Sequence, residues 1–479
     1  MSARSDKVVV SLFSGSLGLD LGLERAGFRI AVAVESNRFA AETIRRNRPD
    51  IKVIDRDIRE VSADEILAAA KLSRGQVAVV TGGPSCQSFS TAGGRESLGD
   101  PRGGLFREFL RIVRGVEPRF FVMENVRGIL SAAVRHRPLA ERGPGFPPLD
   151  EDELLGSALK VVVRSLGRVG YRVVFDLVNA ASYGVPQSRH RVVFLGSRDG
   201  EDVRIPAATH SEGIWRTLRD AIGDLDDLSP EFTKLPSGKA KYLRLIPEGG
   251  NWRDLPVRLQ KKALGRAYDS WGGRSGFFRR LAWDAPSPAL TTKPDSKATV
   301  LCHPEELRPL SVREYARIQQ FPDDWTFAGG TPQKYKMIGN AVPLGLGEAI
   351  GRALVRTMRR APRGPKAPLP AGVECAEKLA ERLAKRPRII MNPPRMRRQK
   401  GLNAAKRWVA ASLGGEGGPT SKHRVDRKKV IPTKKASLPT RRTLPPITVR
   451  GRAAAARLTR IGGKGPRPQP NRTSRKAKK

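Results

Sequence analysis

The chain has 479 residues, and 89 lysines and arginines against 47 aspartates and glutamates give it a formal net charge of +42. At this length we expect roughly three structural units. Hydrophobic residues make up 39% of the sequence, which is enough to bury a core and excludes a fully disordered chain. The positive charge exceeds what solubility requires, and it predicts a polyanionic partner, nucleic acid first and an anionic membrane surface second.

Two other classes of protein are disfavoured. No window approaches the roughly 18 uninterrupted apolar residues of a membrane span, and residues 1–6 lack the pattern of a signal peptide. The sequence thus predicts an intracellular protein with no membrane partner. Cys86, Cys302 and Cys375 are too widely spaced for a disulfide framework or a CxxC zinc site. We therefore expect no bound metal, and a free thiol at Cys86.

The basic residues are concentrated at the end of the chain. Residues 361–479 hold 33 Lys+Arg and 5 Asp+Glu, a net charge of +28, whereas residues 1–360 carry a net charge of only +14. Proline, glycine and basic residues with little periodicity predict a mostly disordered tail. Such a tail either binds phosphates independently of sequence or is an extension with no catalytic role.

Before the tail, the pattern is that of a doubly wound α/β domain. Short β-branched or aromatic runs lie at 8–13, 30–34, 77–80, 120–123, 173–178 and 192–195, and helix-length segments separate most of them. Continuous apolar strands that alternate with helices predict a largely parallel sheet covered on both faces. Between about residues 199 and 297 the segments become short, polar and rich in Trp and Gly, which predicts a smaller, irregular domain.

Polar residues follow the first three strands of the predicted sheet. Gly15 and Gly18 allow a tight turn after the first strand, where open α/β sheets bind ligands, although many such turns are only structural. Glu35 ends the second strand and can accept hydrogen bonds from a ribose diol. Asp57 follows the third strand. Together these residues predict a crevice for a nucleoside cofactor.

The next two strands lead to a candidate nucleophile and a candidate acid. Cys86 lies in GGPSCQSFS, directly after an apolar run, and the flanking Gly, Pro and Ser favour an exposed thiol over a packed one. Glu124 ends the strand of FFVMENV, where a carboxyl group is either an ion-pair partner or a proton donor.

Arg189 and Arg191 lie two residues apart in QSRHR, just before a strand. In an extended segment both would project to one face, where two guanidinium groups repel unless an anion lies between them. The pattern predicts an anion site or a solvated strand edge.

In order along the chain, the blocks FSGSLG, the strand ending in Glu35, GGPSCQSFS, MENV, QSRHR, and ARIQQFPDDW with MIGNAVP resemble those of the bacterial C5-cytosine DNA methyltransferases. The resemblance implies a Rossmann-like sheet that transfers a methyl group from S-adenosylmethionine to C5 of cytosine in a specific double-stranded DNA sequence. It implies that Cys86 attacks C6 of a flipped base while Glu124 donates to N3. Arg191 would hold O2 of the base, and Arg189 would order the nucleophile loop and a nearby phosphate.

The resemblance also implies further contacts and a domain plan. The cofactor-binding residues would be Phe13, Gly15, Gly18, Glu35, Asp57, Ile58, Pro84, Leu105, Asn340 and Val342. The DNA-binding residues would be Gln87, Ser88, Arg253, Arg274, Arg279 and Arg280, of which the last four favour phosphate contacts or packing over base readout. The catalytic domain would comprise residues 1–198 and 298–360, a target-recognition domain residues 199–297, and the tail residues 361–479.

Three questions stay open at this level. An RNA cytosine methyltransferase of the same fold is an alternative, and so is a non-catalytic DNA-binding or nucleoid protein whose basic tail binds DNA. We expect a monomer in the bacterial cytoplasm, associated with the nucleoid. A cognate restriction endonuclease would be its genetic partner if it is not a solitary enzyme.

Overall fold

The computed structural model describes residues 7–84, 104–138, 141–142, 145–226, 228–269 and 276–360. The chain divides into two compact units, Met1–Gly415 and Glu416–Lys479, and every described residue belongs to the first. The predicted basic tail lies outside the described residues, as do Cys86, Gln87, Ser88 and Arg274.

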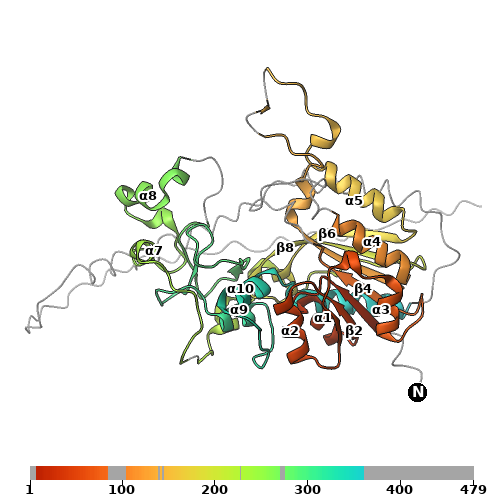
Figure 1. Cartoon of the computed structure of the whole chain (residues 1–479). Helices are drawn as coiled ribbons and strands as arrows, with labels where there is room; N and C mark the ends of the chain where they lie inside the picture. Colours follow the sequence, from red (N-terminus) through yellow and green to blue (C-terminus); the bar gives the residue numbers. More distant parts are fainter. Residues whose placement is uncertain are drawn as a thin grey trace, which may run out of the picture. The chain divides into compact units, whose positions relative to one another are not determined.

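A seven-stranded sheet with the order β3-β2-β1-β4-β5-β8-β6 is the centre of the described chain (Figure 1). Its strands are β1 Val8–Leu12, β2 Arg29–Val34, β3 Lys52–Ile54, β4 Val79–Gly82, β5 Phe120–Val126, β6 Arg172–Asn179 and β8 His190–Ser197. The first five strands pair in parallel, and β8 is antiparallel to both of its neighbours, β5 and β6. A short connection joins β6 to β8, which permits only antiparallel pairing between them.

Helices cover both faces of the sheet, because alternate strand residues enter different cores. Val9 belongs to one hydrophobic cluster, and Val8 and Val10 belong to another. The helices of the first cluster are α1 Gly18–Arg25, α2 Arg38–Asn47, α6 Leu218–Ile222, α9 Val312–Ile318, α10 Thr331–Asn340 and α11 Leu344–Met358. Those of the second are α3 Ala63–Ala70, α4 Leu105–Val116 and α5 Ser157–Gly167. The prediction of a doubly wound α/β sheet is confirmed.

The two ends of the described chain meet where α1 packs against α11. A Cβ atom added to Gly22 would lie 2.3 Å from the Leu344 carbonyl oxygen, and one added to Gly347 would lie 2.4 Å from that of Leu19. Only glycine permits this approach of two helix backbones. It brings the segment just before α11 to the carboxyl end of β1.

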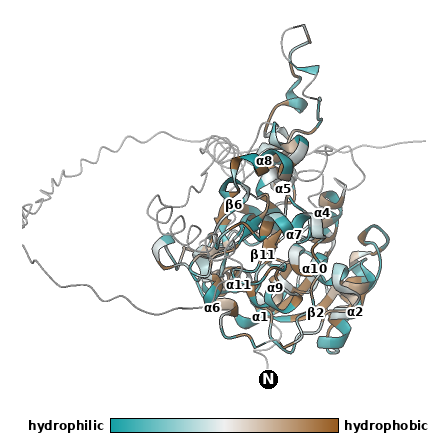
Figure 2. Cartoon of the chain, turned by 90° about the vertical axis from the view of Figure 1, so that its left-hand side faces the viewer, coloured by the Kyte–Doolittle hydropathy of each residue, from teal (hydrophilic) through white to brown (hydrophobic). Residues whose placement is uncertain are grey.

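A third hydrophobic cluster forms the small lobe, which we define as α7 (Ser237–Leu243), α8 (Val257–Leu264) and the paired strands β9 (Arg279–Arg280) and β11 (Leu301–Cys302). Figure 1 shows α7 and α8 apart from the helices that cover the sheet, and in Figure 2 hydrophobic ribbon gathers at the strands. Of the predicted recognition domain, α6 packs in the first cluster and α7 and α8 in the third. Among the described helices, we find none with the length and apolar run needed to cross a bilayer.

Candidate active site

The turn between β1 and α1 is built from unusual backbone conformations. Phe13, Gly15 and Leu17 all have positive φ angles, of 53°, 53° and 65°. A Cβ atom on Gly18 would lie 2.3 Å from the carbonyl oxygen of Val342, so the segment after α10 closes directly over the start of α1. Asn340, the last residue of α10, is exposed. Four of the predicted cofactor residues, Gly15, Gly18, Asn340 and Val342, thus come from this turn and the segment that closes over it.

Glu35 follows β2 and faces the same turn. Its Oε2 accepts a hydrogen bond from the Gly15 amide at 2.7 Å, and its Oε1 accepts one from the Asn37 amide at 2.8 Å. Burial raises the pKa of this carboxyl group. Because a carboxylate oxygen has room for a second hydrogen bond, both oxygens can still accept from a diol.

Asp57, predicted as the second acid of the crevice, is bound within its own turn. Its carboxylate caps the short helix η2 (Ile58–Glu60) by accepting from the Arg59 amide, and it also accepts from the Arg59 guanidinium at 2.8 and 3.0 Å. This ion pair lowers the pKa of Asp57. Ile58 is buried, and its side chain packs in the second cluster. Any cofactor contact by Asp57 therefore competes with Arg59.

The predicted acid Glu124 forms an ion pair with the predicted base-binding residue Arg191. Arg191 Nε lies 2.5 Å from Glu124 Oε1, and both side chains are mostly buried. The pairing of β5 with β8 places them together, since Val126 is opposite Arg191 and Glu124 is opposite Val193. Glu124 also lies beside Gly83, because a Cβ atom there would be 3.1 Å from Glu124 Oε2. The acid and the arginine are thus next to Gly83, which precedes Cys86 by three residues in the sequence.

The residues around that loop start are fixed by the neighbouring strand. Asn125 Nδ2 donates to the carbonyl oxygen of Pro84 at 3.4 Å, and Pro84 is buried. Leu105, the first residue of α4, is half-buried just after the end of the undescribed segment 85–103.

Arg189 is buried rather than at a solvated strand edge, and its predicted role in ordering the nucleophile loop concerns residues outside the described part of the chain. Its side chain is 2% exposed, and it donates to the carbonyl oxygens of Leu290 at 3.1 Å and Gly339 at 2.7 Å. The physical reason for its burial is that the carbonyls of Leu290 and of Gly339, in the last turn of α10, supply acceptors for Arg189, while Glu124 is the ion-pair partner of Arg191.

Two buried glutamines extend this network, and the sequence analysis did not assign them. Gln187 Nε2 donates to Gln319 Oε1 at 3.0 Å, and Gln319 Nε2 donates to the carbonyls of Ile338 and Ala341 at 2.7 and 3.1 Å. Together with Arg189, they hold three carbonyls of the 338–341 segment that leads to Val342. Their only sequence signal is their place in the QSRHR and ARIQQF blocks.

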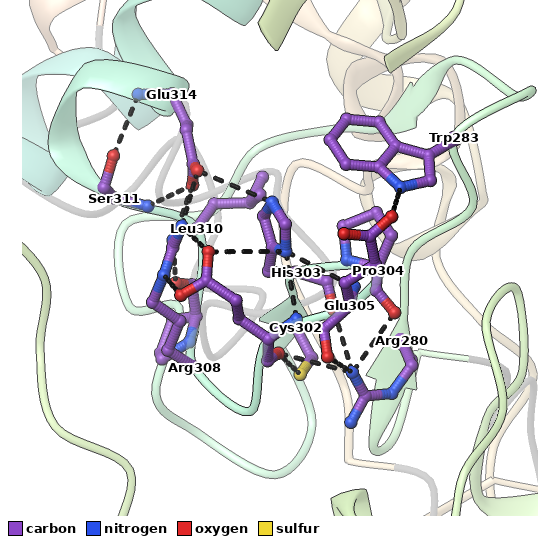
Figure 3. Close-up of polar contacts among 12 residues, drawn as sticks. Arg280, Trp283, Cys302, His303, Pro304, Glu305, Arg308, Leu310, Ser311 and Glu314 are labelled. Atoms are coloured by element: carbon purple, nitrogen blue, oxygen red, sulfur yellow. Dashed lines mark hydrogen bonds and ion pairs between the residues drawn. The ribbon is translucent and has the colours of Figure 1, made fainter. Parts of the chain in front are cut away.

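The three described arginines predicted to bind DNA have different environments. Arg253 is exposed, with its guanidinium 4.9 Å from the centre of the Trp252 ring. Arg279 is half-buried, and burial lowers its pKa. Arg280 is buried, and its Nε and both Nη atoms donate to backbone carbonyl groups, some of which Figure 3 shows. This environment corresponds to the packing alternative of its prediction rather than to a phosphate contact.

Two buried polar groups lie next to the β1–α1 turn. The hydroxyl of Ser16 is buried with no hydrogen-bond partner among the described residues. A buried donor without a partner is costly, so it marks a place where a ligand atom would be accommodated. Asp20 accepts from Ser11 and Thr81 at 2.9 and 2.7 Å, and burial raises its pKa to about 6. The Ser16 hydroxyl, which has no partner among the described residues, and the Glu35 carboxylate make the turn compatible with a polar nucleoside ligand.

Comparison with known proteins identifies this arrangement. The family model for C-5 cytosine-specific DNA methylase matches residues 8–356. Type II methyltransferase M.PspPI of Psychrobacter sp. (strain TA137) is 39% identical over 364 residues, which are 74% of this chain and 80% of that protein. M.Sau96I of Staphylococcus aureus and M.Eco47II of Escherichia coli are each 38% identical over 361 residues, covering 74% and 73% of this chain and 77% and 79% of theirs.

The class of the protein is that of the DNA methylases, since the family model covers nearly all of the described chain. The chain belongs to the C-5 cytosine-specific DNA methylase family. It is a DNA cytosine-5 methyltransferase, as its sequence blocks predicted.

Proposed function

We propose that this protein methylates C5 of cytosine within one specific sequence of duplex DNA, through a covalent bond between Cys86 and C6 of a flipped base. The observation that carries the proposal is the Glu124–Arg191 ion pair beside Gly83, three residues before Cys86. It supplies an acid and a cation next to the loop that holds the only thiol among residues 7–300.

The roles follow from the chemistry of cytosine. Its C5 is a weak nucleophile, and attack of a thiolate on C6 turns the ring into an enamine that is nucleophilic at C5. In our proposal Glu124 donates a proton or a strong hydrogen bond at N3 as negative charge develops there. Arg191 holds O2 and keeps the Glu124 carboxyl in place. Removal of the C5 proton and departure of the Cys86 thiolate restore the aromatic ring.

S-Adenosylmethionine would supply an electrophilic methyl group when bound. In our proposal Glu35 accepts from its ribose hydroxyls, because both carboxylate oxygens are anchored by amides and open to a second donor. The turn at Phe13 and Gly15, the segment at Asn340 and Val342, and Leu105 with Pro84 surround the rest of the molecule. Arg189 acts from behind this site, by holding the Gly339 carbonyl.

The biological setting we propose is restriction and modification. The relatives compared above are named type II methyltransferases, which pair with an endonuclease that cuts the same sequence. We infer a monomer that acts on the nucleoid in the bacterial cytoplasm, with Arg253 and Arg279 in contact with DNA phosphates and Gln87, Ser88 and Arg274 beside the flipped base or its strand.

The decisive test is to express the protein in a bacterial host without cytosine methylation and to sequence its DNA after bisulfite treatment. We expect one short sequence to be protected at a single cytosine position. Purified protein should transfer a tritiated methyl group to duplex DNA and form a denaturant-resistant complex with DNA that contains 5-fluorocytosine. Cys86→Ser should abolish both.

Each result has a clear opposite. Methyl transfer to tRNA but not to duplex DNA would show an RNA methyltransferase of this fold. DNA binding without any methylation would show the non-catalytic alternative, and undiminished methylation by Cys86→Ser would refute the assigned nucleophile.

A further inference from the structure

Arg280, at the end of β9, is enclosed by main-chain carbonyl groups from two segments far apart in the sequence, of which Figure 3 shows the one at 303–306. On one side its Nε donates to the carbonyl of Ile246 at 2.8 Å and its Nη2 to that of Leu243 at 3.1 Å, just where α7 ends. On the other side its Nη1 lies 3.1 to 3.3 Å from the carbonyl oxygens of residues 303, 304, 305 and 306. One side chain thus joins the end of α7 to the loop at 303–306.

The loop at 303–306 has few other means of holding its shape. His303 Nδ1 accepts from the amides of Glu305 and Glu306 at 3.3 and 3.1 Å, and Trp283 Nε1 donates to the Glu305 carboxylate at 2.8 Å. Burial lowers the pKa of His303, which keeps its ring neutral and able to accept. The carbonyls of all four loop residues lie within hydrogen-bond distance of Arg280, and without a guanidinium the buried ones, those of His303 and Pro304, would lose this donor.

A second arginine, Arg308, links the same loop to helix α9 of the catalytic body. Arg308 donates to the Glu306 carboxylate at 2.7 and 2.9 Å and to the Glu314 carboxylate at 2.8 and 2.9 Å. Glu314 lies in α9, where it also completes a capping box with Ser311. Because α9 packs on α10 through the rings of Tyr315 and Tyr335, 4.8 Å apart, the chain of contacts from Arg280 ends on the helix that carries Asn340.

The small lobe and the catalytic body have different hydrophobic clusters, and these meet at β11, where Leu301 belongs to the cluster of the body and Cys302 to that of the lobe. Leu243, Ile246 and Phe278 belong to the cluster of the lobe, and Leu281 and Leu301 belong to the cluster under the sheet. The strand pair β9–β11 lies between the two clusters with Arg280 at its centre. From this position Arg280 donates both to the end of α7 and to the loop at 303–306.

We propose that Arg280 is a positioning residue for DNA recognition: it fixes the small lobe at the orientation in which the lobe meets DNA bound to the catalytic body. The inference rests on the proposed function in taking duplex DNA as the substrate. It assigns to Arg280 an effect on DNA affinity and sequence choice that needs no contact with DNA. Arg308 and Glu314 are the next link of the same connection.

Substitution of Arg280 by lysine, which keeps the positive charge, separates a positioning role of Arg280 from a phosphate contact. A phosphate contact needs only a positive charge, so Arg280→Lys would preserve it. A cage that contacts Nε, Nη1 and Nη2 at once needs the planar fork of arginine, which lysine lacks. Loss of a phosphate contact lowers the slope of log binding constant against log salt by about one unit, whereas misorientation of the lobe leaves that slope unchanged.

The experiment uses the full-length protein and the target sequence found by bisulfite sequencing. We compare wild type, Arg280→Lys, Arg280→Met and the matched control Arg258→Lys, an exposed arginine of α8. For Arg280→Lys we expect KM for DNA to rise about tenfold to a hundredfold, and the preference for the target over a one-base variant to fall. KM for S-adenosylmethionine should stay within twofold, and Arg258→Lys should behave as wild type. The salt slope of Arg280→Met should equal that of wild type.

The opposite results are as definite. An unchanged KM for DNA in Arg280→Lys, or a salt slope lowered by one unit in Arg280→Met, would overturn the proposal. Equal rises in both KM values would also overturn it, because they indicate a general loss of structure. If Arg280→Met does not fold, Arg308→Lys, which also keeps its charge, should reproduce the rise in KM for DNA. A wild-type protein that does not methylate DNA contradicts the proposed function instead.

Discussion

The carboxyl edge of the sheet and the small lobe differ in how their charged residues are used. At the sheet edge, Glu35 directly follows β2 and Glu124 lies near the end of β5, and both are beside the turns in which we place the chemistry. In the small lobe, neighbouring arginines have opposite environments, since Arg253 is exposed and Arg280 is buried in a carbonyl cage. The places of Glu35 and Glu124 follow from where their strands end. The environments of Arg253 and Arg280 depend on how distant segments of the chain pack together.

The two buried arginines show what carbonyl groups in loops and at helix ends require. Arg189 donates to the carbonyl oxygens of Leu290 and of Gly339 in the last turn of α10, and Arg280 to those of Ile246 and of Leu243, the last residue of α7. Neither arginine is exposed by more than 7%. Buried carbonyls in loops and at helix ends need donors, and a guanidinium has five N–H groups to offer. A basic residue in a DNA-binding protein is therefore not by itself a DNA contact.

The largest effect should come from the sheet edge. Glu124→Gln removes the proton donor and leaves Arg191 without its carboxylate, so we expect kcat for DNA methylation to fall by about 10²–10⁴-fold. Single-turnover methyl transfer with saturating DNA measures it. Glu117→Gln, on an exposed glutamate after α4, is the matched control and should keep full activity. A fall of less than fivefold would remove Glu124 from the chemistry.

One layer below that edge, Asp20 should make stability depend on pH. The pKa of Asp20 in the folded protein is about 6, above its ordinary value of 3.8, so the folded state binds the proton more tightly than the unfolded state. The protonated Asp20 therefore stabilises the folded state at low pH, and this stability is lost as the pH rises through 6. Between pH 5 and pH 7.5 this amounts to about 1.4 kcal/mol.

Asp20→Asn should abolish that part of the change. Urea unfolding at the two pH values measures it, with wild type and variant in parallel. An identical pH dependence in both proteins would mean that Asp20 is not the group responsible.

A third prediction separates the two acids of the expected cofactor crevice. Glu35→Gln should weaken binding of S-adenosylhomocysteine about tenfold to a hundredfold, because charged hydrogen bonds to the ribose are lost. Asp57→Asn should change it by less than about fivefold, since Arg59 already holds that carboxylate at the surface. Titration calorimetry measures both without catalysis. A larger effect at Asp57 would reverse the assignment.

The smallest effect is expected in the small lobe. Arg253→Ala should weaken DNA binding only a few-fold and lower the salt slope by about one unit, as for loss of a single phosphate contact. Binding at several salt concentrations measures it. An unchanged salt slope of DNA binding would mean that Arg253 does not contact a phosphate. Arg253 and Arg280 would then differ in burial and not in contact with DNA.

Much of the fold and part of the site could be predicted from local patterns. Apolar runs bounded by turns marked six of the strands, and the residues just beyond two of them, Glu35 and Glu124, lie at one edge because parallel strands end together. The ion pair between Glu124 and Arg191 could not be predicted in this way. It depends on β8 entering between β5 and β6, a long-range pairing that no local pattern records.

By itself, the sequence determined the class of the protein: period and composition specify the doubly wound sheet, and ordered blocks specify the family. Only the tertiary structure decided the use of each polar side chain. Arg189, Gln319 and Arg280 are buried because loops and helix ends from distant parts of the chain present backbone carbonyls that need donors, and Gln187 is buried where it donates to the side chain of Gln319. These carbonyls and their donors come together only when distant segments of the chain pack against each other, so the sequence of any one segment does not predict them.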